Sequence, residues 1–258
     1  MPALSRFGLE DKVAIVTGAG RGIGRVIARE CVESGAAVAI GSRNTDELKT
    51  LSEEIESAGG RCMYHRLDVV DLSSIELFME AVIKHFGRID VLINNAGYNK
   101  SLPILDYDEE IYDQIVDANL KNVFFCCQIA ARQMIKQGDG GAMVNITSQA
   151  GVVGAPERGP YSGAKAGVNN LTRTMAAEWA EHNIRVNAVA PTATRTPLGE
   201  QVAKDSKSFR DAIKSKILLG GEMAEPEEIS APTIFLASDA ASMVTGHTLV
   251  VDGGWTIV

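Results

Sequence analysis

The chain has 258 residues, of which 45% are hydrophobic and 22% charged, a composition ordinary for one soluble α/β domain with a sizeable core. Its net charge of −8 argues against a general nucleic-acid binder, because such proteins present an excess of Lys and Arg to the phosphates. No apolar run is long enough to span a membrane, and residues 1–11 lack the apolar core of a signal peptide, so we expect a cytoplasmic protein with no membrane partner.

The predicted elements alternate between short β-branched strands and amphipathic helices. The candidate strands cover residues 13–17, 36–41, 61–66, 89–93, 142–147, 184–190 and 247–251. The candidate helices cover residues 22–34, 44–58, 71–86, 108–137, 160–182, 198–219 and 226–237, and the fourth is long enough to contain a break. This alternation predicts an α/β, single-domain Rossmann fold over residues 1–258, with a doubly wound, mostly parallel seven-stranded sheet and helices on both faces.

A glycine-rich loop follows the first candidate strand and opens the first candidate helix. It runs Gly18-Ala19-Gly20-Arg21-Gly22-Ile23-Gly24. Gly18 allows a tight turn, Gly22 lets the backbone approach a pyrophosphate, and Gly24 lets the helix pack close to the strand. A helix N-terminus also adds amide donors and a favourable dipole for phosphate. This context therefore predicts a dinucleotide site rather than a glycine turn without a ligand.

The end of the second candidate strand bears on which dinucleotide binds. Ser42 stands where an acidic residue would bind the adenosine ribose 2′-hydroxyl of NAD. Arg43, together with Arg21 from the glycine loop, offers guanidinium groups that suit a 2′-phosphate in charge and geometry. We therefore predict NADP(H) as the favoured cofactor and NAD(H) as the alternative. Asn44 and Thr45 are also good N-cap residues, so helix initiation is the simpler role for this stretch.

Ser148, Tyr161 and Lys165 form a candidate proton-handling set. A tyrosine is a poor acid near neutral pH because its ordinary pKa is about 10, and a nearby lysine ammonium lowers that pKa. Lys165 follows Tyr161 by four residues, so a helix would place both side chains on one face. The Ser148 hydroxyl could hold a carbonyl oxygen beside the phenol. Taken alone, the tyrosine and lysine fit an ordinary exposed helix equally well; the serine and the dinucleotide site favour a redox enzyme.

No other set of side chains competes for this role. The four histidines form no recognisable triad or metal-ligand pair, and residues 145–149 do not form the nucleophile elbow of a serine hydrolase. The cysteines have no CxxC or metal spacing, so we expect reduced thiols and no metal site. These residues are His65, His85, His182, His247, Cys31, Cys62, Cys126 and Cys127.

Several motifs occur together in the order seen in one enzyme family. Thr17-Gly18-x-x-x-Gly22-x-Gly24, Asn94-Asn95-Ala96-Gly97, Asn119, Ser148 and Tyr161-x-x-x-Lys165 resemble the short-chain dehydrogenase/reductase family, and Val251-Asp252-Gly253-Gly254 is similar to its closing segment. The resemblance covers nearly the whole chain. It implies an enzyme that interconverts a ketone and a secondary alcohol by hydride transfer. Tyr161 would transfer the proton, Ser148 would orient the oxygen, and Lys165 would lower the pKa of Tyr161 and bind the nicotinamide ribose.

The resemblance assigns further residues to the site. It implies that Asn119 helps to hold a water-linked proton relay near Lys165, and that the stretch from Pro191 runs past the nicotinamide. One position departs from the family, because Thr192 follows Pro191 where the family has glycine, and a β-branched residue resists the backbone angles of glycine. Asn94 either lines the adenosine ribose region or only satisfies backbone groups. The other cofactor contacts implied are Ile23, Asp68, Val69, Asn95, Ala96, Gly97, Thr194 and Thr196.

The substrate class is less determined. Many similar proteins are 3-oxoacyl carrier-protein reductases, which dock an acidic protein near the site entrance. The corresponding stretches, 138–141 and 180–183, lack Lys and Arg and carry an acid each. We therefore favour a small free carbonyl compound, sugar or polyol over a 3-oxoacyl thioester, and a non-catalytic nucleotide sensor is the remote alternative. The candidate substrate pocket comprises Tyr98, Asn99, Ser148, Gln149, Val153, Tyr161 and the segment 192–219, which is expected to act as a mobile lid.

The C-terminal segment, residues 231–258, predicts assembly into a homotetramer. It carries much apolar surface for a chain end, exposed apolar clusters often mark interfaces, and members of the resembling family commonly assemble in this way. The alternative is that the segment only completes the sheet and covers its edge. Its apolar positions are Phe235, Leu236, Met243, Leu249, Val250, Trp255, Ile257 and Val258.

Overall fold

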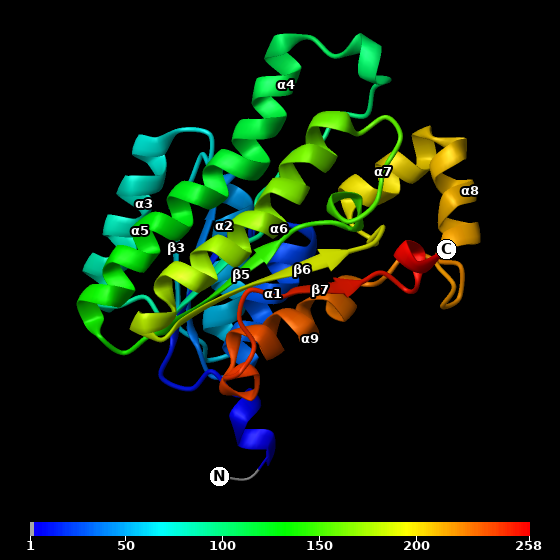
Figure 1. Ribbon diagram of the computed structural model, residues 1–258. Helices are drawn as coiled ribbons and strands as arrows, with labels where there is room; N and C mark the ends of the chain where they lie inside the picture. The colour runs from blue at the N-terminus through cyan, green and yellow to red at the C-terminus, as the bar shows by residue number, and fades with distance from the viewer. Residues whose placement is uncertain (1–2) are drawn as a thin grey trace.

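A seven-stranded parallel sheet runs through the computed structural model, which describes residues 3–258 (Figure 1). The strands lie in the order β3-β2-β1-β4-β5-β6-β7, so the order reverses between β1 and β4. Every adjacent pair is parallel, which confirms the predicted doubly wound sheet. The bounds are β1 (Val13–Thr17), β2 (Ala37–Ser42), β3 (Cys62–Arg66), β4 (Val91–Asn94), β5 (Gly141–Ile146), β6 (Ile184–Pro191) and β7 (Thr248–Val251).

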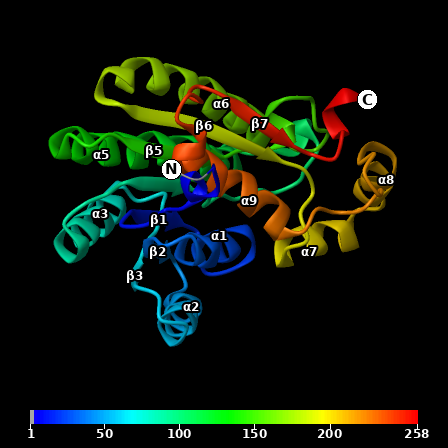
Figure 2. The ribbon, with the colours of Figure 1, turned by 90° about the horizontal axis from the view of Figure 1, so that it is seen from below.

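Helices cover both faces of the sheet, as Figure 2 shows. One face packs against α1 (Gly22–Glu33), α2 (Thr45–Ser57) and α9 (Pro226–Ala237). The other face packs against α3 (Leu72–Phe86), α5 (Asn122–Gln137) and α6 (Gly159–Trp179). All five residues of the central strand β1 are buried, because helices cover the strand on both faces, and four of the five are apolar. The edge strands β3 and β7 are only partly buried.

The long helix predicted over residues 108–137 contains a break. It consists of α4 (Glu109–Val116), a π-helical turn over Asp117–Lys121, and α5. A π-turn adds a residue to the helical repeat and commonly lies at a functional site. Asn119 lies in the middle of this turn, so the break falls at a residue predicted to belong to the site.

Two short helices replace the single helix predicted over residues 198–219. They are α7 (Pro197–Asp205) and α8 (Lys207–Lys216), which lie beside the ends of β6 and β7 (Figure 1). Ser206 separates them, and its Oγ accepts a hydrogen bond from the Phe209 amide at 3.2 Å. The prediction of one continuous helix was wrong because this serine acts as an N-cap and starts a new helix.

A small apolar cluster joins α7 and α8 to the rest of the chain. Its buried members are Ala193, Ala203, Ile213, Ile217 and Trp255. This cluster is separate from the two large cores on the faces of the sheet, so the predicted lid has packing of its own. Within the part of the chain that the structure describes, no helix has both the length and the apolar character needed to cross a lipid bilayer.

Candidate functional site

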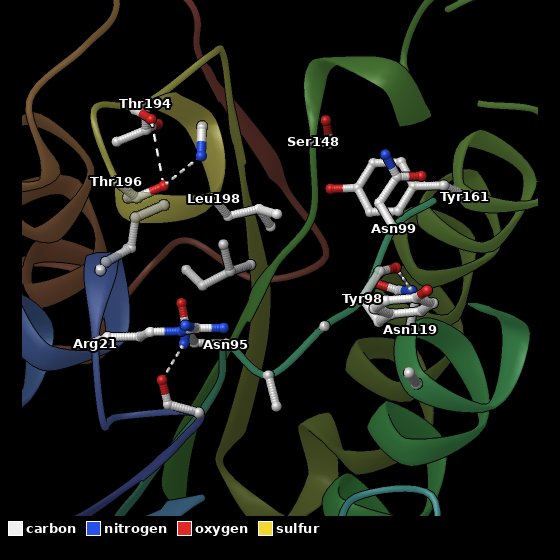
Figure 3. Close-up of a pocket in the computed structure, with 18 of the residues that line it drawn as sticks. Arg21, Asn95, Tyr98, Asn99, Asn119, Ser148, Tyr161, Thr194, Thr196 and Leu198 are labelled. Atoms are coloured by element: carbon white, nitrogen blue, oxygen red, sulfur yellow. Dashed lines mark hydrogen bonds between the residues drawn. The ribbon is translucent and has the colours of Figure 1, made fainter. Parts of the chain in front are cut away.

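A cavity of about 1050 Å³ opens where the parallel strands end, which is the usual ligand position in a doubly wound sheet. Figure 3 shows Arg21 and Asn95 on one side of it and Ser148, Tyr161 and Asn119 on the other. Of the predicted residues, those that line the cavity are Gly18, Arg21, Gly22, Ile23, Ser42, Arg43, Asp68, Val69, Asn95, Ala96, Gly97, Tyr98, Asn99, Asn119, Ser148, Gln149, Tyr161, Lys165, Pro191, Thr192, Thr194 and Thr196. Gly24, Asn94 and Val153 do not line it.

The glycine loop has the conformation that its sequence predicts. Gly18 has a φ of +67°, a region that side chains other than glycine rarely adopt. A side chain at Gly24 would collide with Asn95 Nδ2 and the Gly18 carbonyl, so this glycine allows helix α1 to approach the end of β1 closely. The Asn95 side chain holds the start of this loop, since its Nδ2 donates to the Thr17 carbonyl at 3.0 Å and to the Gly18 carbonyl at 3.1 Å.

The first turn of α1 is open towards a ligand. Its N-cap residue, Arg21, forms no side-chain hydrogen bond to the helix amides. The N-cap of α2 differs, because Asn44 accepts from the amides of Asp46 and Glu47. The first amides of a helix without a capping side chain suit an anionic ligand, and these border the cavity.

The adenosine end of the cavity, as predicted from the sequence, contains charges of both signs. Arg21 and Arg43 are exposed and line it, and the Ser42 hydroxyl donates to the Asn44 carbonyl at 3.1 Å. Glu47 also lines this end, and a side-chain atom added at Gly20 would lie 2.5 Å from its Oε2 and 3.2 Å from Ser42 Oγ. This carboxylate was missed because it stands one helical turn beyond the end of the strand.

Asn94 lies behind the cavity rather than in its wall. Its Nδ2 donates to Asn145 Oδ1 at 2.9 Å and lies 3.1 Å from Cys127 Sγ. Asn145 in turn donates to Thr172 Oγ1 at 3.0 Å. This buried network links β4, β5 and α6, and we infer that Asn94 positions the strands instead of contacting a ligand.

Ser148 and Tyr161 present hydroxyl groups to one part of the cavity (Figure 3). Ser148 lies just beyond the end of β5. Its Oγ donates to Gln149 Oε1 at 2.7 Å and accepts from the Ala150 amide at 3.1 Å. These two bonds orient the Ser148 hydroxyl in the protein without cofactor or substrate.

Two influences oppose each other at the Tyr161 phenol. Burial raises the pKa of Tyr161, while a hydrogen bond with Ser148 and the positive charge of Arg158 act to lower it. Lys165 was expected to supply the lowering charge. Its Nζ instead donates to the Ile146 carbonyl at 2.8 Å and lies 5.6 Å from the centre of the Tyr161 ring. Burial lowers the pKa of Lys165 itself to about 8. The influence of Lys165 on the tyrosine therefore stays a prediction.

Asn119 is held in place by its amide nitrogen. Its Nδ2 donates to the Tyr98 carbonyl at 2.5 Å and to the Ile115 carbonyl at 2.8 Å. Its Oδ1 is buried and has no hydrogen-bond partner. A side-chain atom added at Gly97 would lie 2.7 Å from that oxygen and 3.7 Å from Lys165 Nζ. An unpartnered buried acceptor so close to an ammonium group suits a bridging water, which is what the predicted proton relay requires.

Thr192 fits its position without backbone strain. It is not among the described residues with positive φ, its amide donates to the Val251 carbonyl at 3.1 Å, and its carbonyl accepts from Thr194 Oγ1 at 3.0 Å. The departure from glycine therefore leaves the chain path extended at the end of β6. Thr196 caps α7 by accepting from the Gly199 amide at 3.0 Å, so its hydroxyl has a structural partner as well.

The two stretches that correspond to the docking surface of carrier-protein reductases lie far from the cavity entrance. Residues 138–140 precede β5 and residues 180–183 precede β6, so both lie at the edge of the sheet opposite the strand ends that form the cavity. The expectation that they border the entrance was wrong. In a parallel sheet, the residues that precede the strands and the residues that follow them lie at opposite ends of the strands. The acidic residues in these two stretches therefore do not discriminate between the candidate substrates.

Val153 and Arg158 differ from the sequence-based expectation. Val153 was predicted to line the substrate pocket, but it packs against the apolar cluster of α7 and α8. Arg158, which the sequence reading passed over, lines the cavity together with Phe209 from α8. The only sequence signal for Arg158 was its place three residues before Tyr161, whereas Phe209 lies in the segment 192–219 that was predicted to belong to the substrate pocket.

Known proteins are similar to this chain in both sequence and fold. Residues 18–256 match a family model described as enoyl-(acyl carrier protein) reductase. L-rhamnose 1-dehydrogenase (NAD(P)(+)) of Azotobacter vinelandii is 40% identical over 250 residues, which cover 95% of this chain and 97% of that protein. D-threitol dehydrogenase of Mycolicibacterium smegmatis is 38% identical, with 97% and 95% covered. The 3-oxoacyl-[acyl-carrier-protein] reductase of Thermotoga maritima is 39% identical, with 96% and 99% covered.

Two solved structures show the same likeness in three dimensions. A short-chain type dehydrogenase/reductase from Mycobacterium marinum superposes with a TM-score of 0.94 at 36% identity, covering 99% of this chain and 100% of that one. A gluconate 5-dehydrogenase from Burkholderia cenocepacia, solved in complex with NADP and tartrate, superposes with a TM-score of 0.93 at 34% identity and covers 99% of each chain.

Proposed function

Because the chain belongs to the short-chain dehydrogenase/reductase family, we propose that it is an NADP(H)-dependent enzyme that interconverts a small free ketone and a secondary alcohol, such as a sugar or polyol. As a member of that family it is an oxidoreductase that acts on CH–OH and C=O groups with a nicotinamide cofactor. One observation carries the proposal. The Ser148 and Tyr161 hydroxyls share a cavity with the uncapped first turn of α1.

The cavity wall fits a nicotinamide dinucleotide. In the proposal the first turn of α1 and the glycine loop bind the pyrophosphate, and Asp68 and Val69 border the adenine. Asn95, Ala96 and Gly97 also line the cavity, and in the proposal Pro191, Thr194 and Thr196 border the nicotinamide. The bound cofactor supplies or accepts the hydride.

The chain's own residues then handle the proton. Tyr161 donates its phenolic proton to the carbonyl oxygen in reduction, and tyrosinate removes the alcohol proton in oxidation. Ser148 holds the same oxygen, because its hydroxyl lies beside the phenol. Its proton, which it donates to Gln149 Oε1 in the protein without substrate, turns to the carbonyl oxygen when substrate binds. Asn119 offers a buried, unpartnered oxygen near Lys165, through which water could return the proton.

The cofactor preference rests on the charges at the adenosine end. Arg21 and Arg43 line that end, and Ser42 stands where a carboxylate would repel a 2′-phosphate. Glu47 is the opposing charge, so the preference depends on how close each group comes to the phosphate. The presence of NADP in the Burkholderia cenocepacia structure supports the same choice for this chain, with NAD(H) as the alternative.

The names of the relatives support sugars and polyols as substrates. Two of them act on rhamnose and threitol, both polyhydroxylated small molecules. The Thermotoga maritima relative is nearly as similar and keeps a 3-oxoacyl thioester as the second candidate. The segment 192–219 is proposed as the lid over this substrate, because α7 and α8 have their own apolar cluster and border the cavity.

A substrate panel tests the proposed function. Purified protein would be assayed with sugars, polyols, free ketones and 3-oxoacyl thioesters, each with NADP(H) and with NAD(H), by absorbance of the reduced nicotinamide. We expect turnover of at least one free carbonyl compound or alcohol, with NADP(H) preferred. Turnover confined to acyl thioesters would establish the second candidate. Cofactor binding without any turnover would make the protein a nucleotide sensor.

Lys165 is expected to destabilise the cofactor-free protein at neutral pH. Burial moves its pKa from 10.5 to about 8, a difference that corresponds to about 3 kcal/mol against the charged form. Because the unfolded chain keeps the higher pKa, this cost is fully present below pH 8 and declines as pH rises towards 10.5. Lys165→Met should therefore raise the free energy of unfolding at pH 7 by up to about 3 kcal/mol, and by less at pH 10.

Urea unfolding at the two pH values measures this difference. Lys49→Met is the matched control, because the Lys49 side chain is 62% exposed and a surface substitution usually changes stability by less than about 0.5 kcal/mol. A Lys165→Met protein that is less stable than the original at pH 7 would contradict the prediction. The hydrogen bond from Lys165 to the Ile146 carbonyl would then outweigh the cost of burying the charge.

We also propose a homotetramer with the C-terminal segment at a subunit interface. Met243, Ile257 and Val258 are exposed by 94%, 77% and 65%, whereas Leu236 and Trp255 are buried within the subunit. The exposed residues fit an interface, and the buried ones do not. Deleting residues 255–258 would remove Trp255 from the cluster of α7 and α8, so point changes at the exposed residues are the cleaner test.

Met243→Asp combined with Ile257→Asp should weaken assembly and leave the fold intact, because a buried unpaired carboxylate is costly only in the assembled state. Light scattering over a concentration series gives the mass of the original and altered proteins. Circular dichroism checks the fold. An original protein that stays monomeric at micromolar concentration would refute the tetramer.

A further inference from the structure

Arg158 places a cation at the substrate end of the cavity. It is the N-cap residue of α6, three positions before Tyr161, and it lines the cavity beside Phe209 of α8. Its guanidinium carbon lies 4.6 Å from the centre of the Phe209 ring, so the charge is stacked on an apolar surface. Its positive charge also acts to lower the pKa of Tyr161, which lines the same cavity.

In the part of the chain that the structure describes, this guanidinium forms no ion pair. None of the ion pairs among residues 3–258 includes Arg158, and its side chain takes part in none of the hydrogen bonds assigned there. Glu157 is the adjacent carboxylate, but it is exposed and forms no ion pair with it. A partly buried arginine with five unused donors is costly unless something else binds it.

The backbone holds Arg158 in this position at some cost. Glu157, the residue before it, has a φ of +63°, which is uncommon outside glycine and costs about 1–3 kcal/mol. Two contacts enforce this conformation, because the Glu157 carbonyl accepts from the Leu102 amide at 3.0 Å and from the Tyr107 hydroxyl at 3.0 Å. Such strain usually lies beside a functional site, where it fixes the direction of a side chain.

The charges of the cavity are divided between its two ends. The carboxylates that line it, Glu47 and Asp68, both belong to the adenosine end, next to the ends of β2 and β3. At the other end the charged residues are Arg158 and Lys165, and Lys165 already donates to a backbone carbonyl. Among the side chains that the structure describes, those with a charge at the substrate end are therefore positive, and the Arg158 guanidinium has all its donors available for an anion.

We propose that Arg158 binds a carboxylate on the substrate, so that the enzyme acts on keto acids and hydroxy acids rather than on neutral ketones and alcohols. This inference rests on the proposed function and narrows its substrate class. A guanidinium presents parallel N–H donors that match the two oxygens of a carboxylate. Phe209 belongs to α8, so the proposed lid would cover the carboxylate once it is bound and exclude water from the pair.

Matched pairs of compounds test the substrate class. Each pair is a hydroxy acid and its primary amide, which differ in charge and hardly in shape, assayed in the oxidation direction with saturating NADP⁺. For the original protein we expect kcat/KM for the acid to exceed that for the amide by about 10- to 100-fold, mainly through a lower KM, as expected for a charge-assisted hydrogen bond. Arg158→Met should remove this preference. Loss of the Arg158 charge also raises the pKa of Tyr161, but that effect falls on the acid and the amide alike, so the ratio of their kcat/KM values reports on the carboxylate.

Two further variants serve as controls. Arg173→Met makes the same change of charge on the exposed side of α6, outside the cavity, and should leave the preference for the acid unchanged. Arg158→Lys keeps the charge but not the paired donors, so it should retain part of the preference. If Arg158→Met does not fold, as judged by circular dichroism, Arg158→Lys carries the test.

The outcomes separate this inference from the proposed function. Equal kcat/KM for acid and amide in the original protein would overturn the inference, while the oxidoreductase function would stand. If no pair is turned over, the panel of sugars, polyols and free ketones decides the proposed function, and calorimetry with NADP⁺ present decides the inference. Cyclohexanecarboxylate should then bind the original protein more tightly than cyclohexanecarboxamide, and Arg158→Met should abolish the difference. Equal binding of the two probes would overturn it.

Discussion

Tyr161→Phe should remove nearly all turnover, by about 10²- to 10⁴-fold, while cofactor binding and the fold stay intact. The substitution removes one hydroxyl and keeps the ring that lies over Lys165. General acid–base catalysis by a placed side chain contributes about this much to rate. Steady-state rates in both directions measure the loss. Fluorescence of bound reduced nicotinamide and thermal unfolding show whether the binding site and the fold are unchanged.

Tyr64→Phe is the control for this substitution, because Tyr64 is an exposed tyrosine on the edge strand β3 and does not line the cavity. It should keep full activity. Since burial raises the pKa of Tyr161, alcohol oxidation should become faster as pH rises, because that direction needs the tyrosinate. Carbonyl reduction should lose rate at high pH, because it needs the protonated phenol. Near-normal turnover by Tyr161→Phe would exclude this residue as the acid and base.

Ser42→Asp combined with Arg43→Ala should move the preference from NADP(H) towards NAD(H), by about 10- to 100-fold in the ratio of kcat/KM values. The double change removes a cation that lines the adenosine end and adds a carboxylate that repels the 2′-phosphate. One charge-assisted hydrogen bond is worth about 1.5–3 kcal/mol, which accounts for a ratio of this size. Kinetics with both cofactors on one substrate measure it.

Glu47→Gln is a second test, in which the expected change in cofactor preference is opposite. It removes the carboxylate beside Ser42 and should strengthen the preference for NADP(H). Arg29→Ala, on the exposed side of α1 and outside the cavity, should change neither cofactor's kcat/KM. An original protein that strongly prefers NAD(H) would overturn the role given to Arg43, and it would identify Glu47 as the dominant charge.

The fold and the residues proposed to bind the cofactor could be predicted from the sequence, because both depend on short-range patterns. Within residues 13–34, a β-branched run is followed by a glycine-rich loop and then by apolar residues at helical spacing. Each of these patterns is compatible with few backbone conformations. The four-residue spacing of Tyr161 and Lys165 places them on one helix face by helical geometry alone. Ser42 and Arg43 follow directly from the end of β2, so their place at the cavity was predictable too.

The three-dimensional structure decided what depends on contacts between distant segments. The sequence predicted one helix over residues 198–219, but Ser206 separates two helices. Its capping hydrogen bond to the Phe209 amide outweighs the apolar periodicity that favours a single helix. Lys165 donates to the Ile146 carbonyl on another element, so its distance from the phenol was not set by spacing along its helix. Arg158 became informative because Phe209 lies against it and, among the described side chains, no carboxylate forms an ion pair with it. Local sequence patterns determine helices, strands and turns, whereas burial and pairing across elements determine which charges remain available to a ligand.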